Sequence, residues 1–159
     1  MSAVVKILKD KYQIFNQNAI TFMRTLENSC VDLIIADPPY FEIKGKFDFI
    51  WANQAEYLAW SKEWLLEAKR ILKDNGTLIL WGGVGPKPLT FARLAIMIED
   101  ERIFTIRNWV TQRNTRGIGS GRNYMSARED FLFLTKSQNY TFNVPYSSEK
   151  STRKDLGAN

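Results

Sequence analysis

The hydrophobic residues of the chain form short continuous runs, and longer segments with helical spacing lie between them. Residues 31–36 and 77–81 are apolar almost throughout, which is typical of strands buried on both faces of a parallel sheet. Residues 12–15, 103–112 and 130–135 are predicted to form three further strands. The pattern therefore predicts a sheet whose central strands are buried.

Three helices are predicted between these strands. Residues 19–26 have apolar positions at helical spacing. A longer helix begins at Asn53, where Glu56 completes a capping box, and ends at a C-cap signal at Gly76. The third helix covers residues 87–99. Strands that alternate with helices predict an α/β fold with a mostly parallel sheet and helices on both faces.

The length of 159 residues is that of one domain with a substantial core. We expect residues 1–146 to form the folded, catalytic portion and the polar residues 147–159 to be a mobile tail. No segment approaches the roughly 20 continuous apolar residues that span a membrane. Lysines interrupt the apolar run at the N-terminus, so it does not resemble a secretory signal.

Composition excludes several kinds of chemistry. The chain contains no histidine, and Cys30 is its only cysteine. These counts exclude an internal disulfide, which fits a reducing, cytoplasmic compartment, and also exclude a serine triad and zinc sites of the His/Cys kind. The net charge is +5, and basic residues are frequent from Arg102 onward. Two interpretations of this charge are open: an ordinary solvated surface or a side that faces phosphates.

The tetrapeptide Asp37-Pro38-Pro39-Tyr40 directly follows the buried strand at residues 31–36. In open α/β sheets this edge is where ligands bind. The two prolines stiffen the backbone, so the Asp37 carboxylate and the Pro38 carbonyl form two fixed acceptors, with the ring of Tyr40 nearby. The alternative is an ordinary turn that ends a strand.

Two acceptors beside a flat ring suit a planar exocyclic amine. The lone pair of such an amine is delocalised into its ring, which makes the nitrogen a poor nucleophile. Hydrogen bonds from the amine to Asp37 and Pro38 would localise the lone pair, and the carboxylate would offset the positive charge that develops on nitrogen. This chemistry requires no histidine.

Across nearly its whole length the chain resembles the AdoMet-dependent DNA amino-methyltransferases, which act on adenine N6 or cytosine N4. The tetrapeptide at residues 37–40 matches their catalytic motif, and residues 72–81, 108–110 and 129–136 resemble the segments that follow it. The resemblance implies an incomplete Rossmann-like AdoMet-methyltransferase fold. It also implies double-stranded DNA as the partner and a target base that leaves the stack to lie against Tyr40.

The resemblance further implies where S-adenosylmethionine binds. Asn18 and Ala19 occupy the positions where the family usually has Gly-Asp in contact with the cofactor adenosine. Asp37 and Pro38 are the other cofactor-binding residues that we predict. Adenine is the expected target, because the cytosine-N4 enzymes more often begin the tetrapeptide with Ser than with Asp.

The family's Phe-x-Gly-x-Gly loop for the methionyl end of the cofactor has no match in the chain. Residues 82–85 follow the wrong strand, and residues 117–121 are not followed by a helix. We interpret the latter as a flexible loop. With Arg113, Arg116 and Arg122 it would either contact DNA phosphates or form only a surface turn.

The early position of the tetrapeptide resembles the beta order of motifs, in which the cofactor loop comes last. We therefore expect a split enzyme, a truncated gene or a fragment, with weak AdoMet binding by this chain alone. Exposed apolar surface would favour self-association or a second polypeptide that carries the cofactor loop and the recognition region. Two alternatives are a non-catalytic remnant or interaction subunit, and an RNA or protein amino-methyltransferase.

Overall fold

The computed structural model describes residues 3–5, 12–42, 46–83 and 89–143. The predicted tail at residues 147–159 and the domain boundary at residue 146 lie outside the described residues. So do residues 87 and 88, with which the third predicted helix begins.

Four strands form the main sheet, in the order β3-β4-β6-β5. Their bounds are Val31–Ala36 for β3, Leu72–Gly82 for β4, Thr105–Ser120 for β5 and Asn123–Thr135 for β6. Of these four, β3 and β4 are parallel, and β6 runs antiparallel to both of its neighbours. The sheet is thus mixed rather than mostly parallel, because β5 and β6 are joined by a tight turn that reverses the chain. A separate antiparallel pair joins β1 (Ala3–Val5) to β2 (Ile14–Asn16).

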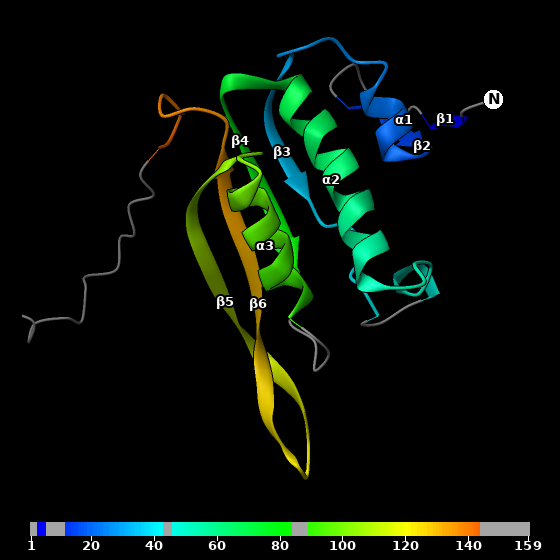
Figure 1. Cartoon of the computed structure of the whole chain (residues 1–159), viewed down its shortest axis with the longest axis vertical. Coiled ribbons are helices and arrows are strands. Elements are labelled where there is room, and N and C mark those ends of the chain that lie inside the picture. The colour runs from blue at the N-terminus through cyan, green and yellow to red at the C-terminus, as the bar shows by residue number, and fades with distance from the viewer. Residues whose placement is uncertain (1–2, 6–11, 43–45, 84–88, 144–159) are drawn as a thin grey trace, which may run out of the picture.

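Two long helices, α2 (Gln54–Ile71) and α3 (Thr90–Asp100), cover one face of the main sheet (Figure 1). A short helix, α1 (Ala19–Met23), packs beside α2, and a 3₁₀ turn spans Lys46–Asp48. The core lies between the sheet and these helices. Its fully buried members include the following residues: Leu65, Leu78, Leu80, Leu94, Ile98, Leu132 and Leu134.

The opposite face of the sheet is not covered by a described helix, which corrects the prediction of helices on both faces. Side chains alternate along a strand, so Leu33 and Ile35 point away from the face on which Ile34 packs against the core. Leu33 is 52% exposed and Ile35 is 66% exposed. Two apolar residues of a strand that was predicted to be buried therefore lie in contact with solvent.

The predicted start of α2 is confirmed, but its predicted end is wrong. Asn53 caps the helix by accepting a hydrogen bond from the Glu56 N–H at 3.0 Å. The helix ends at Ile71, and Leu72 already has extended backbone angles and belongs to β4. Gly76 lies inside β4, where an added Cβ would be 2.9 Å from the carbonyl oxygen of Asp32. That close approach explains the glycine.

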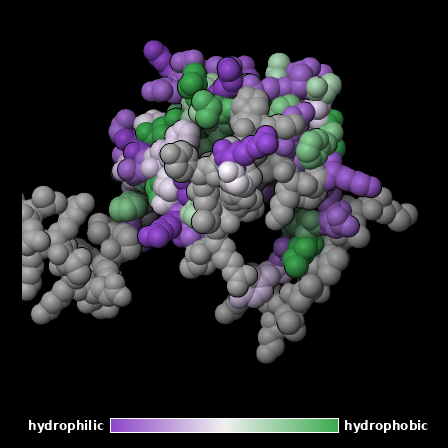
Figure 2. All heavy atoms as spheres, turned by 90° about the horizontal axis from the view of Figure 1, so that it is seen from below, coloured by the Kyte–Doolittle hydropathy of each residue, from purple (hydrophilic) through white to green (hydrophobic). Residues whose placement is uncertain are grey.

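The predicted glycine- and arginine-rich loop is an extension of the β5–β6 hairpin. The ladder continues to the pairs Ile118 with Ser126 and Ser120 with Asn123. Backbone hydrogen bonds do not need apolar side chains, so hydrophobic patterning gave no signal of this extension. Figure 1 shows the hairpin projecting past the end of α3. Seen from that end, hydrophilic and hydrophobic groups are interspersed over the described surface (Figure 2). No described helix is long and apolar enough to cross a bilayer.

Candidate active site

The predicted catalytic tetrapeptide begins where the parallel pair of strands ends. Ala36 pairs with Leu80 in the last register position of β3, and Asp37 follows directly. Pro38 and Pro39 lack N–H groups, so the ladder stops there. The position of Asp37 at the carboxyl end of a parallel strand is that of ligand sites in α/β sheets.

Two buried side chains hold the tetrapeptide in place, and the sequence analysis missed both as site residues. The Asp48 carboxylate accepts a hydrogen bond from the backbone N–H of Tyr40 at 2.8 Å and is only 1% exposed. The hydroxyl of Tyr57, on α2, donates to the Pro39 carbonyl at 3.3 Å. Asp48 lies in a segment without periodicity, so no pattern marked it. Tyr57 is one of the buried residues of α2, so in the sequence its position looks like that of an ordinary core residue.

The hydroxyl of Tyr40 donates a hydrogen bond to the carboxylate of Asp37. Burial raises the pKa of Tyr40 well above its ordinary value, and the bond to Asp37 raises it further. Burial also raises the pKa of Tyr57 to about 12, with a smaller contribution from the charge of Asp48. Both phenols are therefore protonated at neutral pH and act as donors.

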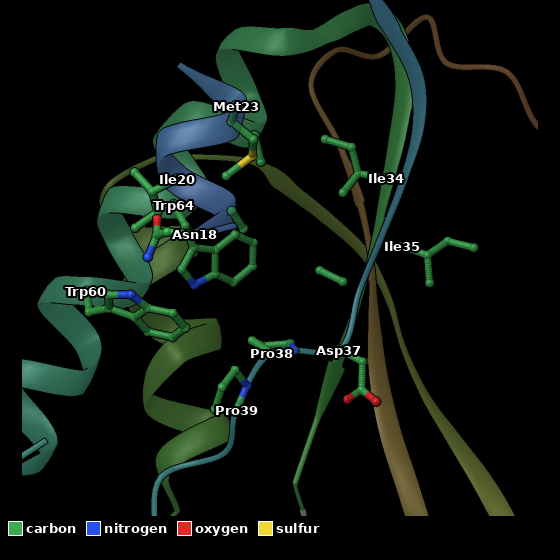
Figure 3. A pocket seen from close by; sticks show the side chains of 13 residues that line it. Asn18, Ile20, Met23, Ile34, Ile35, Asp37, Pro38, Pro39, Trp60 and Trp64 are labelled. Atoms are coloured by element: carbon green, nitrogen blue, oxygen red, sulfur yellow. The ribbon is translucent and has the colours of Figure 1, made fainter. Parts of the chain in front are cut away.

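A cavity of about 370 Å³ lies between β3, α1 and α2, and we call it the helix-side cavity. All four residues predicted to bind the cofactor line it: Asn18, Ala19, Asp37 and Pro38. Figure 3 shows Asn18, Trp60 and Trp64 on one side of it and Pro38 and Pro39 on the other. Residues that are distant in sequence thus line one cavity.

A second cavity of about 880 Å³ opens toward the base of the β5–β6 hairpin, and we call it the hairpin-side cavity. The whole predicted catalytic tetrapeptide lines it. Four further polar or aromatic residues and one apolar residue complete the lining: Asp48, Trp81, Gln112, Glu129 and Ile35. Asp37, Pro38 and Pro39, together with Ile35 of β3, line both cavities and so form a shared wall.

The three predicted DNA-contact arginines all belong to the β5–β6 hairpin. Arg113 is exposed on β5, directly after the cavity residue Gln112, and Arg122 is exposed in the turn. Arg116 lies in β5 as well, and its side chain is outside the described part of the structure. Neither Arg113 nor Arg122 is among the residues that line the helix-side or the hairpin-side cavity.

An Asp-Pro-Pro-Tyr tetrapeptide at the end of a parallel strand, with a cavity on either side of it, is the arrangement predicted for a Rossmann-like methyltransferase. The chain belongs to the AdoMet-dependent DNA amino-methyltransferase family, because a family model described as DNA methylase matches residues 31–156. The family and the Rossmann-like α/β class predicted from the sequence are confirmed, and the mixed sheet is the difference described above.

Among curated relatives, the type II methyltransferase M.HpaI of Haemophilus parainfluenzae is 35% identical over 150 residues, which are 89% of this chain and 46% of that protein. The DNA adenine methyltransferase YhdJ of Escherichia coli K12 is 28% identical over 82% of this chain and 43% of its own length. The chain spans about half the length of the curated relatives it matches.

Solved structures share the fold. The PvuII DNA methyltransferase, described as cytosine-N4-specific, aligns with a TM-score of 0.62 at 14% identity over 86% of this chain and 58% of that one. A putative DNA modification methylase from Thermus thermophilus, complexed with S-adenosyl-L-methionine, aligns with a TM-score of 0.54 at 15% identity. That alignment covers 80% of this chain and 54% of the other.

The helix-side cavity has properties that suit the adenosine part of S-adenosylmethionine. Its volume falls in the range of about 300–1,000 Å³ that is usual for small-molecule sites. Its walls are mainly apolar and include the flat indole ring of Trp60 and the saturated rings of Pro38 and Pro39. The indole N–H of Trp64 is buried without a hydrogen-bond partner in the described structure. A flat, nitrogen-rich ligand fits such a site.

Proposed function

We propose that the chain carries the catalytic centre of a DNA methyltransferase that transfers a methyl group from S-adenosylmethionine to adenine N6. The observation that carries this proposal is the shared wall between two cavities, formed by Asp37, Pro38 and Pro39 with Ile35. A methyl donor in the helix-side cavity and a base in the hairpin-side cavity would meet at that wall. Bound S-adenosylmethionine supplies an activated methyl group.

The role of Asp37 is to accept a hydrogen bond from the exocyclic amine. Its carboxylate draws the amine out of conjugation and offsets the positive charge that develops on nitrogen. In the structure the hydroxyl of Tyr40 donates a hydrogen bond to this carboxylate. On binding, the target amine becomes a hydrogen-bond donor to the Asp37 carboxylate. The ring of Tyr40 then flanks the base.

Reaching the amine requires the base to leave the DNA stack, because the amine is otherwise paired inside the duplex. The hairpin-side cavity is open and lies at the base of a projecting hairpin. Arg113 and Arg122 are placed along this hairpin, where guanidinium groups would contact phosphates. We propose the hairpin as part of the DNA-binding surface.

We propose adenine rather than cytosine as the target base because the tetrapeptide begins with Asp37, whereas the cytosine-N4 enzymes more often have Ser at that position. The named activity of YhdJ is in line with adenine, whereas the PvuII enzyme, which shares the fold, is described as specific for cytosine N4. The chemistry of an exocyclic amine is the same in both cases. Product analysis therefore decides between the two bases.

We also propose that a segment outside these 159 residues completes the cofactor site. Among the described strands, β3 pairs only with β4, so its other edge has unpaired backbone groups. The exposed Leu33 and Ile35 lie beside that edge. A strand and helix that bring the glycine loop would pair with β3 and cover these side chains. Self-association through the same face is the alternative.

The proposed function is tested with S-adenosylmethionine and unmethylated genomic DNA. The chain is assayed alone and together with a polypeptide that carries a glycine loop of the family type, and the DNA is digested to nucleosides for mass spectrometry. We expect N6-methyldeoxyadenosine, with transfer stronger when the second polypeptide is present. N4-methyldeoxycytidine as the sole product would overturn the adenine assignment. No methylated nucleoside in either arm would favour a non-catalytic subunit.

A further inference from the structure

Trp64 has a feature that the proposed reaction does not yet use. This residue of α2 lines the helix-side cavity and is 6% exposed. Its Nε1–H has no hydrogen-bond partner among the described residues. In Figure 3 the nitrogen edge of the indole faces the space between Trp60 and Pro38. An indole N–H is a donor only, so this position calls for an acceptor.

The surroundings of this N–H limit the acceptor that suits it. Native proteins pair nearly all buried polar groups, so an unpaired donor beside a cavity indicates a ligand that completes the bond. Ile20, Met23 and Ala68 line the same cavity and offer no side-chain nitrogen or oxygen. A hydroxyl there would bring an O–H that also needs a partner. An aromatic ring nitrogen accepts without donating, as a carbonyl oxygen does, and in adenine, which has no carbonyl, the ring nitrogens are the acceptors.

We propose that the Trp64 Nε1–H binds a ring nitrogen of adenine when a nucleoside occupies the helix-side cavity. This inference rests on the proposed function, because it assigns that cavity to the adenosine part of the methyl donor. Asn18, at the start of α1, lies on the same side of the cavity. Its side-chain oxygen accepts a hydrogen bond from the Thr21 N–H at 3.1 Å, which fixes the side chain as a polar neighbour for the base.

A weaker contact competes with this assignment. The rings of Trp60 and Trp64 have centroids 6.4 Å apart and are inclined at 56°. An N–H directed at the Trp60 ring would give a weak N–H···π contact and leave no role for a ligand. If the Trp64 N–H binds an adenine nitrogen, its environment changes when a nucleoside binds. If it is directed at the Trp60 ring, its environment does not change.

Nuclear magnetic resonance of the ¹⁵N-labelled 159-residue chain separates them. The chain has five tryptophans, so it gives five indole N–H signals, and the Trp64→Phe variant assigns the one of interest. During titration with adenosine we expect a saturable downfield shift of the Trp64 proton. The signal of Trp109, which packs against Phe91 rather than in this cavity, is the internal control and should stay in place.

Adenosine analogues that lack one ring nitrogen make the test independent of folding defects in the variant. One of 1-deaza-, 3-deaza- and 7-deaza-adenosine should bind the wild type about threefold to tenfold more weakly than adenosine, as for the loss of one neutral hydrogen bond. In Trp64→Phe that difference should vanish. Circular dichroism and thermal unfolding confirm that this variant is folded.

Three results would overturn the proposal: a Trp64 signal that does not move with adenosine, analogues that bind the wild type as well as adenosine does, or a deaza effect that persists in Trp64→Phe. The proposed function fails differently. Methyl transfer to DNA without a Trp64 response leaves the enzyme assignment standing and removes only this contact. A Trp64 response without transfer in the assembled assay retains the nucleoside site and removes the methyltransferase assignment.

Discussion

The side chains of Asp37 and Tyr40 are joined by a hydrogen bond. The phenol hydroxyl donates to the carboxylate, so the acceptor proposed for the target amine is held by a protein donor until the base arrives. The exchange costs little, because one hydrogen bond to Asp37 replaces another. Tyr40 therefore has two separable properties, a flat ring and a hydroxyl.

Substitutions at Tyr40 distinguish these properties. We expect Tyr40→Phe to retain most of the turnover, because stacking needs only the ring and the loss of the hydroxyl frees Asp37. Tyr40→Ala should reduce turnover severely, because base–aromatic stacking contributes about 1–3 kcal/mol. Steady-state methylation of DNA by the assembled enzyme measures both variants. Equal losses in the two would indicate that the hydroxyl itself takes part.

Asp48 is predicted to stabilise the catalytic loop. Removing its buried carboxylate in Asp48→Ala leaves the Tyr40 N–H without its acceptor, so unfolding should become easier by about 1.5–3 kcal/mol, the usual range for a charge-assisted hydrogen bond. Urea unfolding followed by circular dichroism provides the measurement. Asp74→Ala is the matched control, because that side chain is 86% exposed and its ion pair with Lys136 should contribute less than about 1 kcal/mol. Similar losses in both variants would contradict a special role for Asp48.

At the scale of elements, sequence patterns predicted those helix and strand boundaries that depend on neighbouring residues in the chain. The bounds of β3 and the cap of α2 at Asn53 are as predicted, because a continuous apolar run and an Asn/Glu pair at the correct spacing are local signals. Strands at residues 103–112 and 130–135 were predicted, but their extension into a long β5–β6 hairpin was missed, since backbone pairing extends through residues with no apolar alternation. The place of β6 between β4 and β5 is a tertiary property that no local pattern records.

Gly82, at the end of β4, is predicted to be required for the packing of α3. An added Cβ would lie 2.0 Å from the Phe91 ring, so Gly82→Ala must displace that ring or the helix. Thermal and urea unfolding should show a loss of about 1–3 kcal/mol, as for other overpacked cores. Gly121→Ala is the control, because no atom lies within 4 Å of its added Cβ. A Gly82→Ala chain as stable as the Gly121→Ala chain would show that the α3 contact is loose.

The candidate catalytic tetrapeptide can be picked out of the sequence because proline, acid and aromatic ring are adjacent in the chain. The rest of the site cannot be, because Asp48, Gln112 and Glu129 come from three separate segments that only the fold brings together. The predicted cofactor residues Asn18 and Ala19 do line a cavity with Asp37. Their assignment depended on resemblance to the family rather than on any physical signal in the two residues.

At the scale of the whole molecule, one sheet face and one strand edge lack cover among the described residues. We predict that the isolated chain associates with itself through this face, so that Leu33→Glu shifts it toward monomer in sedimentation velocity. Leu66→Glu is the control, because Leu66 is 46% exposed on α2, the element that covers the other face. A monomeric wild-type chain, or equal effects of the two variants, would contradict association through the open face.

The central claim is that Asp37 activates an exocyclic amine at the wall between the two cavities. Methyl transfer to unmethylated DNA by wild type and Asp37→Ala, both assembled with the glycine-loop polypeptide, tests it most directly. We predict no detectable N6-methyldeoxyadenosine from Asp37→Ala and an unchanged unfolding midpoint, because Asp37 follows the end of β3 and is not part of the buried core. Near-normal turnover by Asp37→Ala would contradict the account.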